Sequence, residues 1–136
     1  EKVKAGKIEG AYVVVTNHDN YHAPFFLEKL VKALDDNPDA PGAYCSAMVH
    51  NYAGFPGQVP APGKQNVEDG YNIIQVKPER GYMDCACAMI RAPLAGAVGW
   101  PDYSHSSDWT YLNSIAQKNG GWARFKVVPG VLLVHN

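Results

Sequence analysis

The sequence predicts an α/β fold, a mixed sheet with flanking helices, on three observations. Short apolar runs rich in β-branched or small residues recur along the chain and are typical of buried strands. Two longer segments carry apolar residues at helical spacing. Glycine, proline and asparagine separate the two kinds of segment. With 136 residues, the chain is expected to form a single domain.

The first predicted strand is Ala11–Thr16, and we expect the rest of the chain to be organised around it. Its apolar run has no polar alternation, which indicates a strand buried on both faces. Asn17, His18 and Asp19 follow directly. Ligands of open α/β sheets bind beyond the carboxyl ends of strands, so these residues are candidates for a site. A plain polar turn is an equally consistent interpretation.

The next predicted element is a helix over Pro24–Asp36, ended by Asn37 and Pro38. A strand over Ala43–Val49 follows. The segment 51–70 is rich in glycine and proline and is predicted to be a long loop, either functional or a mobile surface segment. Tyr71–Val76 is a short predicted strand. The helix's apolar stripe has i, i+3, i+4, i+7 spacing: Leu27, Leu30, Val31 and Leu34.

The second half begins with a strand over Asp84–Arg91, which leads into a short helix at Ala92. A second long helix is predicted over Asp108–Lys118, capped by Ser106 or Ser107. Its apolar face is Trp109, Leu112, Ile115 and Ala116. Two final strands, Arg124–Val128 and Val131–Val134, are expected on either side of a break at Pro129 and Gly130.

Composition excludes several classes of function. The formal net charge is −1 and there is no basic run, so a nucleic-acid partner is not expected. No apolar run reaches the ~20 residues of a transmembrane helix, and no signal peptide is visible. Three cysteines argue against a disulfide framework and favour the cytoplasm. Cys85 and Cys87, two apart in a strand-like run, are expected to share a buried face.

Polar residues stand at three comparable places in this pattern. Asn17–Asp19 follow the first strand, Asp108 opens the second long helix, and His135 ends the last strand. Oxygen and imidazole ligands together suit a divalent metal of the Mn²⁺ or Zn²⁺ type. A carboxylate at a helix start is stabilised as an anion, which suits a general base and equally an ordinary helix start.

The order of these motifs resembles that of GT-A glycosyltransferases of the inverting family 2 type. An apolar strand ends in a DxD-like motif, AYVVVTNHDN, and a proline-containing helix, a turn and a strand follow. A small-residue strand ends in an arginine, CACAMIR, and an acidic residue precedes an aromatic-led helix, SSDWTYLNSIAQ. An apolar strand ending in a histidine, VLLVHN, closes the pattern, which covers almost the whole chain.

The resemblance implies an inverting transfer of a sugar from a nucleotide-sugar donor to a glycan or other acceptor hydroxyl. It implies that Asp108 is the catalytic base and that Asp19 and His135 are ligands of Mn²⁺ or Mg²⁺. Asn17 stands where the family has the first Asp of its motif, so one charge is missing there. The remaining residues implied are nucleotide-sugar contacts at Asn17, His18 and Arg91, and acceptor contacts at Trp100, Tyr103, His105 and Trp109.

The resemblance also implies a partial domain. Family members have βα units that hold the nucleotide base before the DxD strand, whereas this chain begins just before that strand. The chain is therefore expected to be the central and acceptor-side part of a GT-A domain. An edge left open by missing strands would favour a homo-oligomer. The expected location is the cytoplasm, including the inner membrane surface.

Two other functions remain open from the sequence. One is a divalent-metal hydrolase that uses His18, Asp19, His22 and His135 as ligands with a bound water. The other is a non-catalytic carbohydrate-binding or assembly module on the same scaffold, which the asparagine at position 17 and the missing N-terminal units favour.

Overall fold

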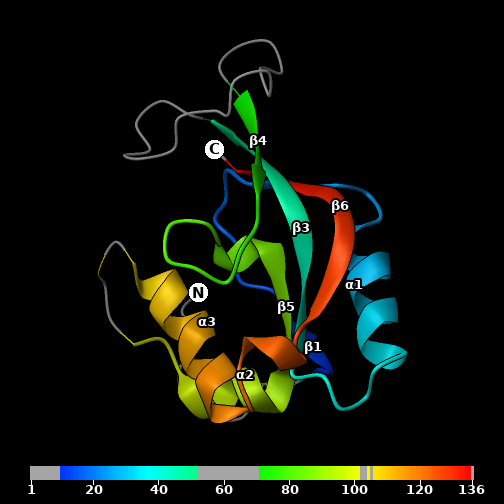
Figure 1. Cartoon of the computed structure of the whole chain (residues 1–136), viewed down its shortest axis with the longest axis vertical. Helices are drawn as coiled ribbons and strands as arrows, with labels where there is room; N and C mark the ends of the chain where they lie inside the picture. The colour runs from blue at the N-terminus through cyan, green and yellow to red at the C-terminus, as the bar shows by residue number, and fades with distance from the viewer. Residues whose placement is uncertain (1–9, 52–70, 102–103, 105, 136) are drawn as a thin grey trace.

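The computed structural model describes residues 10–51, 71–101, 104 and 106–135. It is a mixed α/β structure with one curled sheet, as predicted (Figure 1). Helix α1 packs against the central strands β3 and β6, whereas α2 and α3 lie on the other side of the sheet, near β5. The elements are β1 (Tyr12–Val13), β2 (Tyr21–His22), α1 (Phe26–Asp35), β3 (Gly42–Asn51), β4 (Tyr71–Gln75), η1 (Cys85–Cys87), β5 (Ala88–Arg91), α2 (Ala92–Val98), α3 (Ser107–Lys118), η2 (Trp122–Arg124) and β6 (Lys126–His135).

Strand β3 is the centre of the sheet. The strand order is β1-β5-β3-β6-β2, and β4 pairs with the second half of β3. β3 runs parallel to β6 and antiparallel to β5 and β4. At its start, a Cβ on Gly42 would lie 2.5 Å from the Phe125 ring and 2.9 Å from the Met89 carbonyl oxygen, so only glycine fits. The strand predicted over Ala43–Val49 is confirmed and extends by a residue or two at each end.

The first strand differs from its prediction. Within the predicted strand only Tyr12–Val13 form a ladder, antiparallel to β5, and β1 lies at the edge of the sheet that the described residues form. Val14 and Val15 pack partly against the core and remain half-exposed. The prediction of a strand buried on both faces is therefore wrong. An apolar run on the inner side of an edge strand looks the same in sequence as a central strand.

Helix α1 is shorter than predicted and uses a slightly different stripe. Pro24 lies in the turn before the helix, and Phe26, Leu30 and Leu34 form the buried face. Leu27, predicted to be buried, is 59% exposed. The predicted and the observed apolar stripe both fit a period of 3.6 residues. In the structure Phe26 packs against the His22 ring, with 4.2 Å between ring centroids, and this contact favours the observed stripe.

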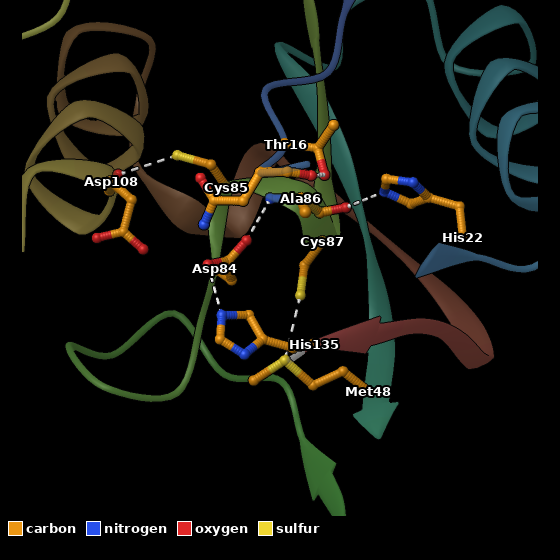
Figure 2. A network of polar contacts seen from close by, with 10 residues as sticks. Thr16, His22, Met48, Asp84, Cys85, Ala86, Cys87, Asp108 and His135 are labelled. Carbon is orange, nitrogen blue, oxygen red and sulfur yellow. Dashed lines mark hydrogen bonds and ion pairs between the residues drawn. The ribbon is translucent and has the colours of Figure 1, made fainter. Parts of the chain in front are cut away.

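The strand predicted over Asp84–Arg91 is replaced by a 3₁₀ turn, η1, followed by β5. The Ala86 backbone N–H donates to Asp84 Oδ1 at 2.7 Å, and this local bond competes with a strand ladder. Cys85 and Cys87 are buried, but they do not share a face. The Cys85 thiol donates to the Asp108 carbonyl, whereas the Cys87 thiol contacts Met48 Sδ (Figure 2).

The last two predicted strands form one strand, β6, with an irregularity at Pro129 and Gly130. Pro129 has no N–H to donate, and Gly130 has a φ of +123°. The Gly130 N–H donates instead to Ser46 Oγ at 3.0 Å, which keeps β6 beside β3 through the break. Arg124, predicted as a strand residue, belongs to η2.

Helix α3 begins at Ser107, with Asp108 in its first turn. Its buried face is Tyr111, Leu112, Ile115 and Ala116, whereas Trp109 is half-buried. Ser106 occupies the N-cap position but makes no capping bond through its side chain, contrary to prediction. No helix among the described residues is long and apolar enough to cross a membrane. The loop predicted within 51–70 lies outside the described residues, apart from its first residue.

Candidate functional site

A cleft of about 640 Å³ opens at the end of the sheet where β6 finishes. Its walls come from the segment after β1, the loop before η1, the first turn of α3 and the end of β6. These segments come from both ends of the chain and from its middle. Five of the site residues predicted from the sequence line this cleft: Asn17, Trp100, Asp108, Trp109 and His135.

His135 is held in the cleft wall by Asp84, a residue that the sequence prediction did not select. Its Nε2 lies 3.2 Å from Asp84 Oδ2, and the two side chains are 20% and 15% exposed (Figure 2). The other oxygen of Asp84 accepts from the Ala86 N–H, so both carboxylate oxygens are used. The carboxylate is therefore fixed to the backbone of η1 and fixes the imidazole in turn.

The pKa of His135 is raised above its ordinary value of 6.5. The hydrogen bond to Asp84 is the main cause, and burial opposes it by disfavouring the charged ring. The charges of Asp19 and Asp108 raise this pKa further. Three carboxylates thus act on one imidazole, and the side chains of Asp19 and Asp108 are both within electrostatic reach of it.

The His135 ring is also fixed by stacking. It lies on the ring of His50, with 4.5 Å between centroids and an interplanar angle of 14°. His50 is its register partner across the parallel ladder of β3 and β6. The remaining ring nitrogen of His135, Nδ1, is buried and has no hydrogen-bond partner among the described residues. A buried nitrogen without a partner is uncommon and needs a ligand, an ion or a water to satisfy it.

Asp108 lines the cleft from the first turn of α3. Its side chain lies on the side of the helix nearer Asp84, and its carbonyl accepts the weak bond from the Cys85 thiol (Figure 2). Burial, followed by the charges of Asp108 and Asp84, raises the pKa of that thiol well above its usual range. Cys85 is therefore held as a neutral thiol, which does not favour a cysteine nucleophile.

Arg80 brings positive charge to the rim of the cleft. Its Nε and Nη2 donate to Ser106 Oγ at 3.1 and 2.7 Å. This contact explains why Ser106 does not cap α3 with its side chain. It also ties the loop before η1 to the start of α3, so two walls of the cleft are joined at this point.

Two tryptophans form the apolar part of the cleft. Trp100 packs on Tyr111 at 5.0 Å between ring centroids. Trp109 stacks on Trp122 at 5.7 Å with nearly parallel rings, and the Trp122 Nε1–H donates to Asn113. Each tryptophan ring therefore packs against another aromatic ring, which limits its movement. Flat, rigid aromatic faces of this kind suit the apolar faces of a sugar or another ring.

The residues of the DxD-like motif differ in their position relative to the cleft. Asn17 lines the cleft, whereas His18 is exposed in the following turn and does not. Asp19 is also exposed in that turn, and its charge reaches His135. Of the three residues of the motif, Asn17 is therefore the one that lines the cleft.

Arg91 lies away from the cleft, in contrast to its predicted contact with the nucleotide sugar. Its guanidinium donates to the backbone carbonyls of Leu34 and Ala40, both at 2.8 Å. It also lies over the Tyr12 ring, 5.7 Å from the centroid. These bonds satisfy one carbonyl in the last turn of α1 and one in the connection to β3, so they give Arg91 a structural role.

Tyr103 and His105, predicted to contact the acceptor, lie outside the described residues. The four-ligand set considered for a hydrolase is not assembled, because His22 Nε2 lies 3.0 Å from the Ala86 carbonyl and its ring packs on Phe26. Within the part of the chain that the structure describes, no three His, Cys, Asp or Glu side chains are arranged to hold a metal ion. A metal at His135 and Asp19 would need most of its ligands from a substrate and water.

Asp84 and His50 were missed for different reasons. His50 is polar and directly follows a predicted strand, which is the same signal that points to His135. The sequence predicts Asp84 as the first residue of a strand, whereas in the structure it precedes a 3₁₀ turn and its carboxylate contacts His135. Arg80 lies in a loop that carries no motif.

Comparisons with known proteins assign no function to the residues of this cleft. A scan against protein-family models finds no family that matches the chain. A search of curated proteins likewise finds no relative.

Proposed function

We propose that the chain belongs to a glycosyltransferase of the GT-A type, which transfers a sugar from a nucleotide-sugar donor to an acceptor hydroxyl with inversion. The observation that supports this proposal is the composition of the cleft. A single space is lined by Asn17 of the DxD-like motif, by Asp108 and by His135, which lie far apart in sequence. The order of motifs and their convergence on this space are independent observations.

Asp108 is the proposed base. In an inverting transfer, the acceptor oxygen attacks the anomeric carbon while the bond to the nucleoside diphosphate breaks. The Asp108 carboxylate takes the proton from the acceptor hydroxyl, and a positioned base typically contributes about 10²–10⁴-fold to the rate. Trp100 and Trp109 line the same cleft and would hold the acceptor against their rings.

The departing diphosphate gains negative charge, and two features of the chain support a role in stabilising that charge. Arg80 carries a fixed positive charge at the rim. Asp19 and the unpartnered Nδ1 of His135 are the groups that would hold a divalent ion, which would act as a Lewis acid toward the leaving group when bound. Mg²⁺ and Mn²⁺ commonly take few protein ligands and complete their shells with phosphate oxygens and water.

The test is calorimetric titration with a panel of nucleotide sugars, with Mn²⁺ and with a chelator. The proposal expects at least one sugar nucleotide to bind, and only when Mn²⁺ is present. Tight binding of the metal alone, without a nucleotide requirement, would point to a hydrolase instead. Binding of a glycan without metal or nucleotide would identify a carbohydrate-binding module.

A further inference from the structure

The His135 imidazole is held on two sides, and one ring atom remains without a partner. Asp84 Oδ2 lies 3.2 Å from Nε2, and the His50 ring lies against one face of the imidazole. Nδ1 is buried and has no hydrogen-bond partner among the described residues. These contacts fix both the plane and the rotation of the ring.

The chemistry of the carboxylate determines which nitrogen carries the hydrogen. An ionised carboxylate can only accept, so Nε2 must donate to Asp84 Oδ2. When the imidazole is neutral, its single hydrogen is therefore on Nε2, and the lone pair is on Nδ1. Histidines that ligate metals are commonly fixed in this way, by a carboxylate that accepts from the nitrogen opposite the metal.

We propose that Asp84 is a positioning residue that fixes His135 as its Nε2–H tautomer and so prepares Nδ1 as a ligand for a divalent cation. The cation part rests on the proposed function, in which His135 is a metal ligand. The tautomer part stands on the geometry alone. Asp84 acts through His135 in this proposal: one oxygen accepts from the imidazole and the other from the Ala86 N–H.

Asp84→Asn is the decisive variant because it changes the hydrogen-bond pattern but hardly changes the shape. The asparagine oxygen keeps the bond from the Ala86 N–H, since turning the amide would place two donors against each other. The amide NH₂ then faces Nε2, which must accept. The hydrogen moves to Nδ1, and the lone pair needed for a metal is lost at that atom.

The experiment measures the tautomer of His135 and the affinity for Mn²⁺ alone. Imidazole ¹⁵N shifts, assigned with a His135→Ala spectrum, are recorded at a pH where the ring is neutral. We expect the Nε2–H tautomer in the wild-type protein and the Nδ1–H tautomer in Asp84→Asn. Mn²⁺ affinity is measured from the free ion by electron paramagnetic resonance, and we expect weak binding in the wild type and about 10- to 100-fold weaker binding in Asp84→Asn.

Asp36→Asn is the matched control, because its carboxylate pairs with Lys32 on the surface after α1. It should change neither measurement. An Nδ1–H tautomer in the wild type overturns the proposal without any variant, and so does an unchanged tautomer in Asp84→Asn. Mn²⁺ binding that is absent in the wild type, or unchanged in Asp84→Asn, overturns the cation part. If the tautomers are as expected but no sugar nucleotide binds, the proposed function is contradicted. The positioning role of Asp84 is then still supported.

Discussion

At the scale of single residues, Asp108 and His135 approach the same cleft from different elements and carry different chemistry. Asp108 stands in the first turn of α3, where the helix dipole favours a negative charge. His135 ends β6 and is surrounded by carboxylates that favour its positive charge. The surroundings of Asp108 favour a negative charge and those of His135 a positive one. A substitution at each should therefore affect a different measured property.

Asp108→Asn should leave the fold and the binding of the donor largely intact while lowering turnover by about 10²-fold or more. The amide keeps the shape of the carboxylate but cannot accept the proton of the acceptor hydroxyl. Steady-state kinetics with the donor found by calorimetry measures the effect, and Asp36→Asn serves as the remote control. Normal turnover in Asp108→Asn would remove this residue from the mechanism.

The raised pKa of His135 predicts a pH dependence of the free energy of unfolding. Because the folded pKa lies above the unfolded value near 6.5, the charged ring binds its proton more tightly in the folded state. The stabilisation is fully present below the unfolded pKa and is lost as the pH rises through the folded pKa. Urea unfolding across this range should show the loss in the wild type.

His135→Ala removes the titrating group, so its unfolding free energy should lack this component of the pH dependence. Asp84→Asn should also reduce it, because the hydrogen bond to Asp84 is the main cause of the shift. An identical pH profile in the wild type and His135→Ala would contradict the assignment.

At the scale of elements, the sequence pattern predicted most helices and strands but placed the first strand wrongly. Hydrophobic periodicity reports which residues face a core, and it succeeded for β3 and α3, where neighbouring elements cover the segment. It carries no information about which strand pairs with which. The sequence therefore predicts a buried position for Ala11–Thr16, whereas among the described residues β1 pairs with β5 alone.

In the candidate site, too, local sequence patterns predict some residues, whereas contacts between distant elements escape them. Asp108 and His135 are predicted site residues because each stands at the terminus of an element with a recognisable pattern. The contact between Asp84 and His135 joins η1 to β6, and no local pattern indicates such a pair. Arg91 was selected by its motif position, but its guanidinium is used by the carbonyls of Leu34 and Ala40. A motif position does not determine where a long side chain points.

Helix α1 provides a direct test of the corrected stripe. Leu30 is fully buried, whereas Leu27, on the same helix, is 59% exposed. Leu30→Ala should lower the free energy of unfolding by about 2–5 kcal/mol, because it removes buried methyl groups and leaves a cavity. Leu27→Ala should change it by less than about 0.5 kcal/mol. Urea denaturation of both variants measures the difference. Equal losses of unfolding free energy would contradict the observed stripe and favour the one predicted from the sequence, in which Leu27 is buried.

At the scale of the whole molecule, the cleft depends on the complete fold. Its walls are formed by segments near both ends of the described chain, by the loop that carries Arg80 and Asp84, and by the start of α3. The Arg80–Ser106 and Asp84–His135 contacts connect these segments across the space. No wall survives when the sheet comes apart, so a ligand bound in the cleft has no site in the unfolded chain.

This dependence predicts that a bound donor stabilises the whole protein. A sugar nucleotide with Mn²⁺ at about 100 times its dissociation constant should raise the free energy of unfolding by about 2.7 kcal/mol. Thermal and urea unfolding with and without both ligands measure the gain. Asp108→Asn should keep it, because the base acts on the acceptor, whereas His135→Ala should lose most of it at the same ligand concentrations. If the donor binds with equal affinity to wild type and His135→Ala, its diphosphate lies elsewhere, and the cleft described here is then not the donor site.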